Sequence, residues 1–283
     1  MIPLTQELCI NLIKERSSTA HKYNHGKLLV VGGSERYVGA PQLTTMAAYR
    51  TGVGLVALAC PRSIIPAVSS FSKETIFFPL PQDHLFLLES INNFSACVVG
   101  PGLGRSKQTK ALLKELMAKL TIPTILDADA LSILGEEKMG MQLHPGTQFI
   151  VTPHEGEMAM MLGWTSREVK KNREVAAVKI AKLIQGITIL KGPGTLIAEA
   201  SGELYKNTTG NVNLATAGTG DVLAGMIGSL LAQGYDALES AQLGVFLHGY
   251  AGDLWKERHG DRGMLASDLL DLIPDSYTAL LQQ

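Results

Sequence analysis

The residues with the clearest chemical potential lie at positions 218–221, Gly-Thr-Gly-Asp, where an apolar pattern with helical spacing begins. The apolar positions 222, 223, 226, 227, 230 and 231 repeat every three or four residues, so the glycines lie at the start of a helix. A helix start presents unpaired N–H groups, and its dipole favours negative charge. Gly218, Thr219 and Gly220 therefore form a candidate site for a phosphate group or an oxyanion, and Asp221 stands beside it.

Asp221 has two interpretations that the sequence leaves open. A carboxylate repels a bound anion, so its place beside an anion site suits a general base that takes a proton from an attacking hydroxyl group. The alternative is a helix cap, because aspartate is common in the first turn of helices for electrostatic reasons alone. The glycine-rich surroundings favour the general base. No partner acid is evident at the loop itself.

Two more groups of polar residues follow apolar segments that are typical of strands. Lys191-Gly192-Pro193-Gly194-Thr195 follows residues 187–190 and could hold a diphosphate, although it does not match a Walker motif. Asp127 and Asp129 follow residues 124–126. Acids in such a place often hold a metal or a substrate hydroxyl group, and capping of the next helix is an equally open interpretation.

His154 and Glu157 are three residues apart and share a helical face, so we weighed metal ligation by this pair. One histidine and one carboxylate are a weak metal signal, and the methionines at 158, 160 and 161 are more typical of a core. The small residues of Gly39-Ala40-Pro41 could let a flat ring approach the backbone, or they could simply start a helix.

The elements that must position these residues follow from the apolar pattern. Strands are expected at residues 27–31, 55–59, 75–78, 96–99, 124–126, 149–151, 187–190 and 196–198. Helices are expected at residues 3–16, 39–50, 107–120, 130–134, 166–185 and 237–257, and also after His154, at the glycine loop and from Ser267. The lysines and arginines of 166–185 are expected to form a solvated face. The alternation predicts an α/β fold, a mainly parallel sheet with helices on both faces.

Length and composition favour a single domain over residues 1–283, because 46% of the residues are hydrophobic and only 18% are charged. The 25 basic residues nearly balance the 26 acidic ones, and no basic stripe interleaved with aromatic residues occurs, so no nucleic-acid partner is expected. The 3 cysteines lie far apart, which is typical of buried thiols in a reducing compartment. No segment resembles a membrane span or a signal peptide, so we expect a cytoplasmic protein.

Eight segments together resemble the NAD(P)H-hydrate dehydratase family, repair enzymes with a ribokinase-like fold. In chain order they are His21-Lys22 with Gly26-Lys27, Gly32-Gly33-Ser34, Gly39-Ala40-Pro41, Gly100-Pro101-Gly102-Leu103-Gly104, Leu126-Asp127-Ala128-Asp129-Ala130-Leu131, Thr152-Pro153-His154-Glu155-Gly156-Glu157, Lys191-Gly192-Pro193-Gly194-Thr195 and Gly218-Thr219-Gly220-Asp221-Val222-Leu223-Ala224-Gly225. The resemblance covers about residues 20–275. Each motif alone is weak, and many ribokinase-like kinases share the last one, so the order and spacing carry the match.

The resemblance implies a two-step reaction on NADHX or NADPHX, in which a hydroxyl group has added at C6 of the reduced nicotinamide ring. Transfer of a phosphoryl group from ADP, or from ATP in some relatives, makes that hydroxyl a good leaving group. The ring nitrogen then expels phosphate, and loss of a proton restores NAD(P)H. Elimination with so good a leaving group does not require a strong second acid.

The resemblance also implies a role for each matching residue. Asp221 is the base, and the N–H groups of Gly218, Thr219 and Gly220 stabilise the transferred phosphoryl group. The nucleotide is bound by Lys191, Gly192, Pro193, Gly194, Thr195 and Gly220. The hydrate is bound by Ala40, Gly102, Leu103, Gly104, His154 and Asp221. Mg²⁺ is expected to bridge the phosphates, with Glu157 as an outer partner through water.

Two departures from related patterns affect these expectations. Many ribokinase-like kinases carry Asn-x-x-Glu where this chain has His154 to Glu157, which fits the dehydratases better. We expect no fused epimerase domain of the kind that some family members carry, because the 283 residues leave no room for it, and we therefore expect action on one epimer, with epimerisation left to another protein. The family resemblance further leads us to expect a homo-oligomer, in particular a tetramer.

Two other functions stay open. A ribokinase-like kinase of a vitamin precursor, of the hydroxyethylthiazole or hydroxymethylpyrimidine type, would use the same Asp221 but release a stable phosphate ester. A nucleotide-sensing protein would bind the nucleotide without turnover. An acid beside an intact glycine loop argues against such a sensor.

Overall fold

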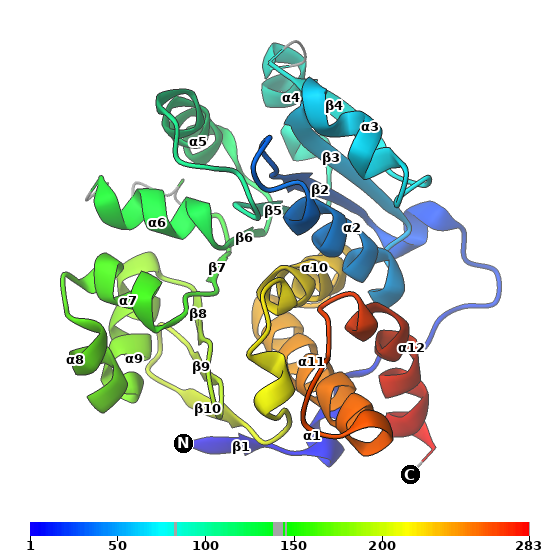
Figure 1. The fold of residues 1–283 in the computed structure, drawn as a ribbon, viewed down its shortest axis with the longest axis vertical. Helices are drawn as coiled ribbons and strands as arrows, with labels where there is room; N and C mark the ends of the chain where they lie inside the picture. The colour runs from blue at the N-terminus through cyan, green and yellow to red at the C-terminus, as the bar shows by residue number, and fades with distance from the viewer. Residues whose placement is uncertain (82–83, 138–143, 145, 283) are drawn as a thin grey trace.

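Ten strands pair into one sheet in the part of the chain that the structure describes, residues 1–81, 84–137, 144 and 146–282 of a computed structural model (Figure 1). The strands are β1 (Ile2–Leu4), β2 (Lys27–Val31), β3 (Leu55–Pro61), β4 (Ile76–Leu80), β5 (Ala96–Val99), β6 (Thr124–Leu126), β7 (Phe149–Val151), β8 (Ile187–Leu190), β9 (Leu196–Ala198) and β10 (Leu204–Asn207). Their order is β1-β10-β9-β8-β7-β6-β5-β2-β3-β4. Only β9 runs antiparallel to both of its neighbours; the other pairs are parallel.

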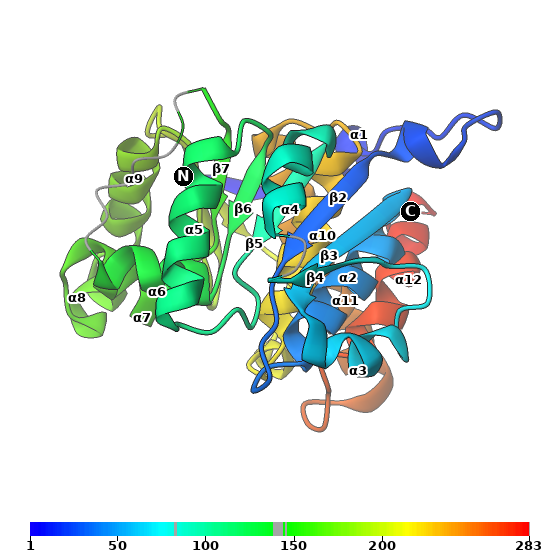
Figure 2. The same cartoon turned by 90° about the horizontal axis from the view of Figure 1, so that it is seen from above.

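Helices cover both faces of this sheet. They are α1 (Gln6–Leu12), α2 (Gly39–Thr51), α3 (Ile65–Ser69), α4 (His84–Ser90), α5 (Lys107–Lys119), α6 (Asp129–Glu136), α7 (Glu155–Leu162), α8 (Ser166–Lys171), α9 (Arg173–Ile184), α10 (Thr219–Ala232), α11 (Ala237–His259) and α12 (Asp268–Leu281). Figure 2 shows α5, α6, α7 and α9 on one side of the strands and α2, α11 and α12 on the other. The expected α/β architecture is therefore confirmed. Within the described ranges, none of these helices has the length and apolar character needed to cross a membrane.

The continuous apolar strands explain why the sheet is covered on both faces. In β2, Leu28 and Val30 belong to the core beneath α2 and α10, whereas Leu29 and Val31 belong to the opposite core. Successive side chains of a strand point to opposite faces, so an unbroken apolar run suits a strand with helices on both sides. All four side chains are fully buried.

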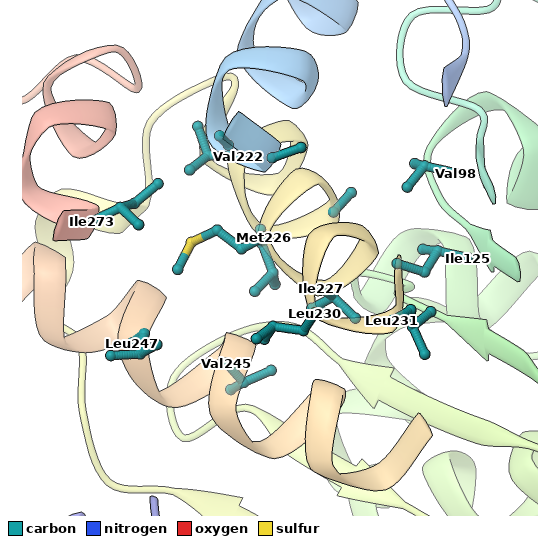
Figure 3. Packing of buried hydrophobic residues seen from close by; sticks show 14 of the residues in the cluster. Val98, Ile125, Val222, Met226, Ile227, Leu230, Leu231, Val245, Leu247 and Ile273 are labelled. Atoms are coloured by element: carbon teal, nitrogen blue, oxygen red, sulfur yellow. The ribbon is translucent and has the colours of Figure 1, made fainter. Parts of the chain in front are cut away.

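Helix α10 lies in the middle of one core and carries the glycine loop at its start. Figure 3 shows its side chains packed towards Val98 and Ile125 of the sheet and towards α11 and α12. Two glycines permit this close packing. A Cβ on Gly225 would lie 2.2 Å from the carbonyl oxygen of Thr44 in α2, and a Cβ on Gly228 would lie 2.5 Å from a methyl group of Val98. The core thus holds the start of α10 firmly against the sheet.

Two of the expected helices are wrong. Residues 3–16 form β1 and then the short α1, because β10, which the sequence pattern did not reveal, offers β1 a parallel partner. Residues 166–185 form two helices, α8 and α9, because Asn172 leaves helical geometry with φ −129° and ψ 42°. The second correction matters for the candidate site, since it determines where Arg173 points.

Candidate active site

The polar loops singled out in the sequence leave the carboxyl ends of neighbouring strands. Strands β2, β5, β6, β7 and β8 are adjacent and parallel. The residues that directly follow them are Gly32, Gly100, Asp127, Thr152 and Lys191. Carboxyl ends of parallel strands meet at one edge of a sheet, where α/β proteins commonly bind ligands. The start of α10 lies at this edge too, since a Cβ on Gly220 would lie 3.4 Å from Lys191 Nζ.

The glycine loop forms the first turn of α10, as expected. Gly218 is the N-cap and has the left-handed φ of +94°, which favours glycine. The Thr219 hydroxyl donates hydrogen bonds of 2.9 Å to the carbonyl oxygens of Leu214 and Thr216, which fixes the loop. Asp221 is the third residue of the helix and not its N-cap. Asp221 is thus not the capping residue itself, but it lies in the first turn, where the helix dipole favours an acid, so its role as a general base stays a prediction.

Asp221 has an unusual electrostatic environment for an aspartate. Burial and, next, the nearby charge of Asp127 raise the pKa of Asp221 to about 7, although the Lys191 ammonium opposes the shift. Asp129 and Glu157 contribute smaller shifts in the same upward direction. The loop itself carries no partner acid, as expected, but the fold brings these carboxylates near it from distant segments. A carboxyl group with this pKa can accept a proton and return it near neutral pH.

Lys191 lies among these carboxylates. Its Nζ is 2.8 Å from Asp127 Oδ1 and 3.9 Å from Glu157 Oε2. Burial alone would lower the pKa of Lys191, but the two carboxylates outweigh burial and raise the pKa, so the ammonium stays charged. A charged ammonium beside Gly220 is well placed to bind a phosphate group. Asp127 is only 1% exposed, and ion pairing with Lys191 is the role that its surroundings indicate.

A cavity of about 450 Å³ opens between the Lys191–Thr195 turn and the start of α10. The whole turn lines it, together with Thr219 and Gly220. Its remaining walls are formed by Asn207, Thr209, Gly210, Asn211, Val212, Leu214, Ala215, Leu223, Val245, His248 and Gly249. A cavity of this size, with a largely apolar lining and several polar side chains among it, suits a nucleotide.

His248 lines this cavity from α11, although no motif in the sequence pointed to a role for it. Its Nε2 lies 2.9 Å from the carbonyl oxygen of Thr219. A carbonyl oxygen only accepts, so Nε2 carries the proton and donates. Burial lowers the pKa of His248 to about 4, so the ring is neutral at physiological pH. A neutral histidine thus supports the first turn of α10 without adding charge to the site.

Arg173 is a second residue whose role the sequence did not reveal. Its guanidinium group donates to the carbonyl oxygens of Leu190, at 3.2 Å, and Lys191, at 3.3 Å, and pairs with Glu155 at 2.9 Å. A solvated face was expected here, but the Arg173 side chain is only 17% exposed. The break at Asn172 starts a new helix with Arg173, which lies beneath the nucleotide turn.

The residues expected on the hydrate side are partly brought together. A Cβ on Gly102 would lie 2.9 Å from the Cβ of Ala40, so the two loops touch. The Gly104 amide donates a 2.8 Å hydrogen bond to Asp129 Oδ2. The Leu103 side chain is packed in the core, which leaves only its backbone free to face a ligand.

His154 and Glu157 form a capping box at the start of α7. His154 Nδ1 accepts hydrogen bonds from the amides of Gly156, at 2.9 Å, and Glu157, at 3.1 Å, while Glu157 Oε2 accepts from the His154 amide at 2.8 Å. In the neutral ring the proton is therefore on Nε2, which can donate to a ligand because the side chain is 60% exposed. Burial, with the charge of Lys191, lowers the pKa of His154.

The carboxylates of this edge do not form a metal cage. No group of three or more His, Cys, Asp or Glu side chains in the described ranges is arranged to hold a metal ion. Glu157 is 5% exposed, and burial raises its pKa. Its expected outer role towards Mg²⁺ through water stays a prediction.

Comparison with known proteins identifies the family. The family model described as NAD(P)H-hydrate dehydratase matches residues 28–275. The chain belongs to this family. The matched range contains the glycine loop, the nucleotide turn and every loop of the site edge.

Individual relatives agree with this assignment. The chain is 39% identical over 280 residues to the bifunctional NAD(P)H-hydrate repair enzyme of Moorella thermoacetica, covering 96% of this chain and 53% of that protein. It thus spans about half the length of the bifunctional relatives it matches. It is also 39% identical over 262 residues to the ADP-dependent (S)-NAD(P)H-hydrate dehydratase of Neisseria meningitidis, covering 92% of this chain and 87% of that one.

Solved structures confirm the fold. The ADP/ATP-dependent NAD(P)H-hydrate dehydratase of Bacillus subtilis, co-crystallised with ATP and Mg²⁺, superposes with a TM-score of 0.87 at 28% identity, covering 99% of this chain and 98% of that one. A ribokinase-like superfamily protein of Enterococcus faecalis gives a TM-score of 0.88 at 24% identity, covering 100% and 97%. The chain therefore has a ribokinase-like fold.

Proposed function

We propose that this protein is an ADP-dependent (S)-NAD(P)H-hydrate dehydratase that converts NADHX and NADPHX back to NADH and NADPH. The observation that carries the proposal is the position of Asp221. Its carboxyl group, with the pKa raised to about 7, stands in the first turn of α10 beside a cavity suited to a nucleotide. Family membership and the dehydratase of Neisseria meningitidis support the choice of substrate.

In the first step Asp221 removes the proton of the C6 hydroxyl group. The hydroxyl oxygen attacks the terminal phosphorus of ADP, the bond from that phosphorus to the bridging oxygen breaks, and AMP leaves with the electron pair. The amides of Gly218, Thr219 and Gly220 stabilise charge on the transferred group, a contribution of roughly 3 kcal/mol per donor in comparable oxyanion sites. Lys191 lies beside Gly220 and binds the phosphate oxygens.

In the second step the lone pair of the ring nitrogen drives cleavage of the C6–O bond, and phosphate leaves. Loss of the proton at C5 then restores the double bond of the reduced nicotinamide. Because the leaving group is phosphate, the protein need only hold the ring and keep water away. Ala40 and Gly102, whose loops are in contact, would form one wall for the ring, and Nε2 of His154 would donate to an acceptor of the hydrate.

Mg²⁺ bound on the nucleotide phosphates would neutralise part of their charge. Mg²⁺ usually keeps several waters and is held by one or two carboxylates together with the substrate phosphates, and Glu157, 3.9 Å from Lys191 Nζ, would be such a carboxylate. The Bacillus subtilis dehydratase was co-crystallised with ATP and Mg²⁺. We extend the use of Mg²⁺, and of ADP or ATP as donor, to this chain as part of the proposal.

The test is to supply NADHX with ADP or with ATP and to follow the return of NADH absorbance. Recovery of NADH that depends on the nucleotide supports the proposal. Phosphorylation of a thiazole or pyrimidine alcohol with no effect on NADHX would identify a vitamin kinase instead. Nucleotide binding without any turnover would indicate a sensor.

Location and assembly belong to the proposal as well. We propose a cytoplasmic homo-oligomer, a tetramer by family resemblance, with no membrane or nucleic-acid partner. Light scattering of the purified protein at several concentrations tests the assembly, and a mass of a single chain of 30.3 kDa would contradict it. Epimerisation of the hydrate by another protein is tested by offering the opposite epimer alone.

A further inference from the structure

The turn Asp127-Ala128-Asp129 places a strained residue between two carboxylates. Ala128 has φ +49° and ψ −118°, a conformation that residues with a side chain rarely adopt. Backbone hydrogen bonds hold the turn from both sides. The Asp127 amide donates to the carbonyl oxygen of Val99 at 3.0 Å, and the Ser132 amide donates to that of Ala128 at 3.0 Å. These bonds keep Ala128 in its strained conformation, and the side chains of Asp127 and Asp129 on either side of it point in different directions.

The first carboxylate points to the nucleotide half of the site. Asp127 Oδ1 holds Lys191 Nζ at 2.8 Å. The ammonium also interacts with the charges of Glu157 and Asp221, so three carboxylates attract it. Its bond to Asp127 keeps it on the side of the strand β6, which leaves the Asp221 carboxylate free of a direct ion pair in the described structure.

The second carboxylate points to the hydrate half. Asp129 Oδ2 accepts the Gly104 amide at 2.8 Å, and Oδ1 lies 3.8 Å from Nε of Arg105. Gly104 has φ +74°, so its loop has no regular secondary structure to hold its amide in place. The side chain of Asp129 supplies the fixed acceptor that the loop otherwise lacks.

We propose that Asp127 and Asp129 are positioning residues for the two halves of the site, Asp127 by holding Lys191 away from the base Asp221 and Asp129 by fixing the Gly104 amide. The strained conformation of Ala128 allows Asp127 and Asp129, only two positions apart, to reach both halves of the site. The proposal rests on the proposed function for its kinetic part. Its structural part concerns only nucleotide binding and backbone protection, which can be measured without turnover.

The nucleotide half is tested with Asp127→Asn, which keeps the shape but removes the charge. Lys191 should move towards Asp221 and make it a weaker base, so kcat should fall by about tenfold or more while the Kd of ADP changes by less than about threefold. The acid limb of the pH profile should also move to lower pH. Asp221 then faces Lys191, Asp129 and Glu157 without the like charge of Asp127. An unchanged kcat overturns the role proposed for Asp127. A fall in kcat without a shift in the acid limb of the pH profile overturns it as well.

The hydrate half is tested by hydrogen exchange of the peptide that contains Gly104. Asp129→Ala should expose this amide and raise its exchange rate by about tenfold or more, and Asp129→Asn should restore protection because its amide oxygen accepts the same bond. The KM for NADHX should rise in Asp129→Ala and stay near the wild-type value in Asp129→Asn, with the Kd of ADP unchanged in both variants. Glu136→Gln is the matched control, because Glu136 pairs with Arg105 in the same loop through a half-exposed contact of 2.6 Å.

The outcomes separate the inference from the proposed function. A wild-type protein that leaves NADHX untouched contradicts the proposed function, while exchange at Gly104 still tests Asp129. Equal exchange in wild type and Asp129→Ala overturns the inference whatever the activity. An equal loss of Gly104 amide protection in Asp129→Ala, Asp129→Asn and Glu136→Gln would also overturn the inference. Such a result would indicate general loosening of the loop.

Discussion

At the scale of single residues, Asp221 owes its chemistry to groups far away in the sequence. Asp127 and Lys191 lie 94 and 30 positions earlier, yet both act on its pKa. The identity of Asp221 as a candidate base could be predicted, because the glycine loop and the acid are neighbours in the chain. The ion pair of Lys191 could not, because only the sheet brings strands β6 and β8 to the same edge.

Substituting Asp221→Asn should abolish turnover without harming the fold. The amide keeps the shape but cannot accept the proton, so kcat should fall by about 10²- to 10⁴-fold while ADP still binds. The variant should also melt at a higher temperature than wild type at pH 8. The raised pKa of Asp221 means that the folded protein prefers the protonated form, so stability is lost as pH rises from about 4 towards 7.

This stability difference should become small at about pH 3, where Asp221 is protonated in the folded wild-type chain and largely protonated in the unfolded one. Melting curves of both proteins between about pH 3 and about pH 8 provide the measurement. A variant with near wild-type kcat would show that the base is misassigned. A variant that melts at a lower temperature at pH 8 would show that the carboxylate has a structural role.

The pH dependence of wild-type activity tests the same residue independently. Since the base must be ionised, kcat/KM should rise with pH and reach half of its maximum near the pKa of Asp221, about 7. An aspartate in water would place this limb near 4. ADP binding should be measured at each pH, because the nucleotide phosphate titrates as well. A limb near 4 after that correction contradicts the assigned environment.

At the scale of elements, the first turn of α10 contains two glycines with different tasks. Gly218 has φ +94°, and a Cβ there would lie 2.6 Å from a methyl group of Leu43. Gly220 lies inside the helix, and a Cβ there would face Lys191 Nζ at 3.4 Å. The sequence indicated a glycine-rich helix start, but it could not show which glycine needs its backbone freedom and which leaves room for a ligand.

The two glycines should therefore respond differently to alanine. Gly220→Ala should lower kcat/KM strongly, because the methyl group occupies space beside the phosphate site. Its melting temperature should stay the same or rise, since alanine favours a helix interior by about 0.5–1 kcal/mol. Gly218→Ala, in contrast, should lose stability in addition to activity, by about 1–3 kcal/mol. Thermal melts with matched activity assays make the comparison, and equal loss of stability in both variants would contradict it.

The break between α8 and α9 shows what periodicity cannot detect. Residues 166–185 carry a pattern that is compatible with one long helix, so a boundary at Asn172 was not predictable from propensity. The break is stabilised by tertiary contacts: Arg173 satisfies carbonyl oxygens at the end of β8 and pairs with Glu155. A charged residue expected in solvent instead supports the nucleotide turn.

Replacing Arg173→Lys should weaken nucleotide binding. A lysine ammonium lacks the planar fork that reaches Leu190, Lys191 and Glu155 together. We expect the KM for ADP to rise by about tenfold, the equivalent of about 1.4 kcal/mol, with a smaller effect on kcat. Arg167→Lys, at an exposed position of α8, is the matched control. The same KM in wild type and Arg173→Lys would show that the turn needs no support.

At the scale of the whole molecule, the parallel sheet is what turns scattered motifs into a site. The buried parallel strands β2, β5, β6, β7 and β8 were predictable with nearly correct bounds, because each is an apolar run closed by glycine or a polar turn. The strands β1 and β10 were missed, since both are short and lie at the far side of the sheet, where pairing depends on tertiary contacts. The site edge needed only the central strands.

The proposed reaction determines where the transferred phosphate goes. An ordinary alcohol phosphate is stable in water, but at C6 of the hydrated ring the adjacent nitrogen expels it. A kinase that shares this fold and the same base would stop at the ester. The fate of the phosphorylated species therefore separates the two functions more directly than any variant does.

The decisive measurement is a single turnover with NADHX and ADP labelled in its terminal phosphate, quenched at a series of times. The account predicts that free labelled phosphate and NADH appear together, one for one, with AMP formed in the same amount. A labelled phosphate ester should be detected only as a transient intermediate. A lasting phospho-ester without NADH would contradict the account and indicate a kinase.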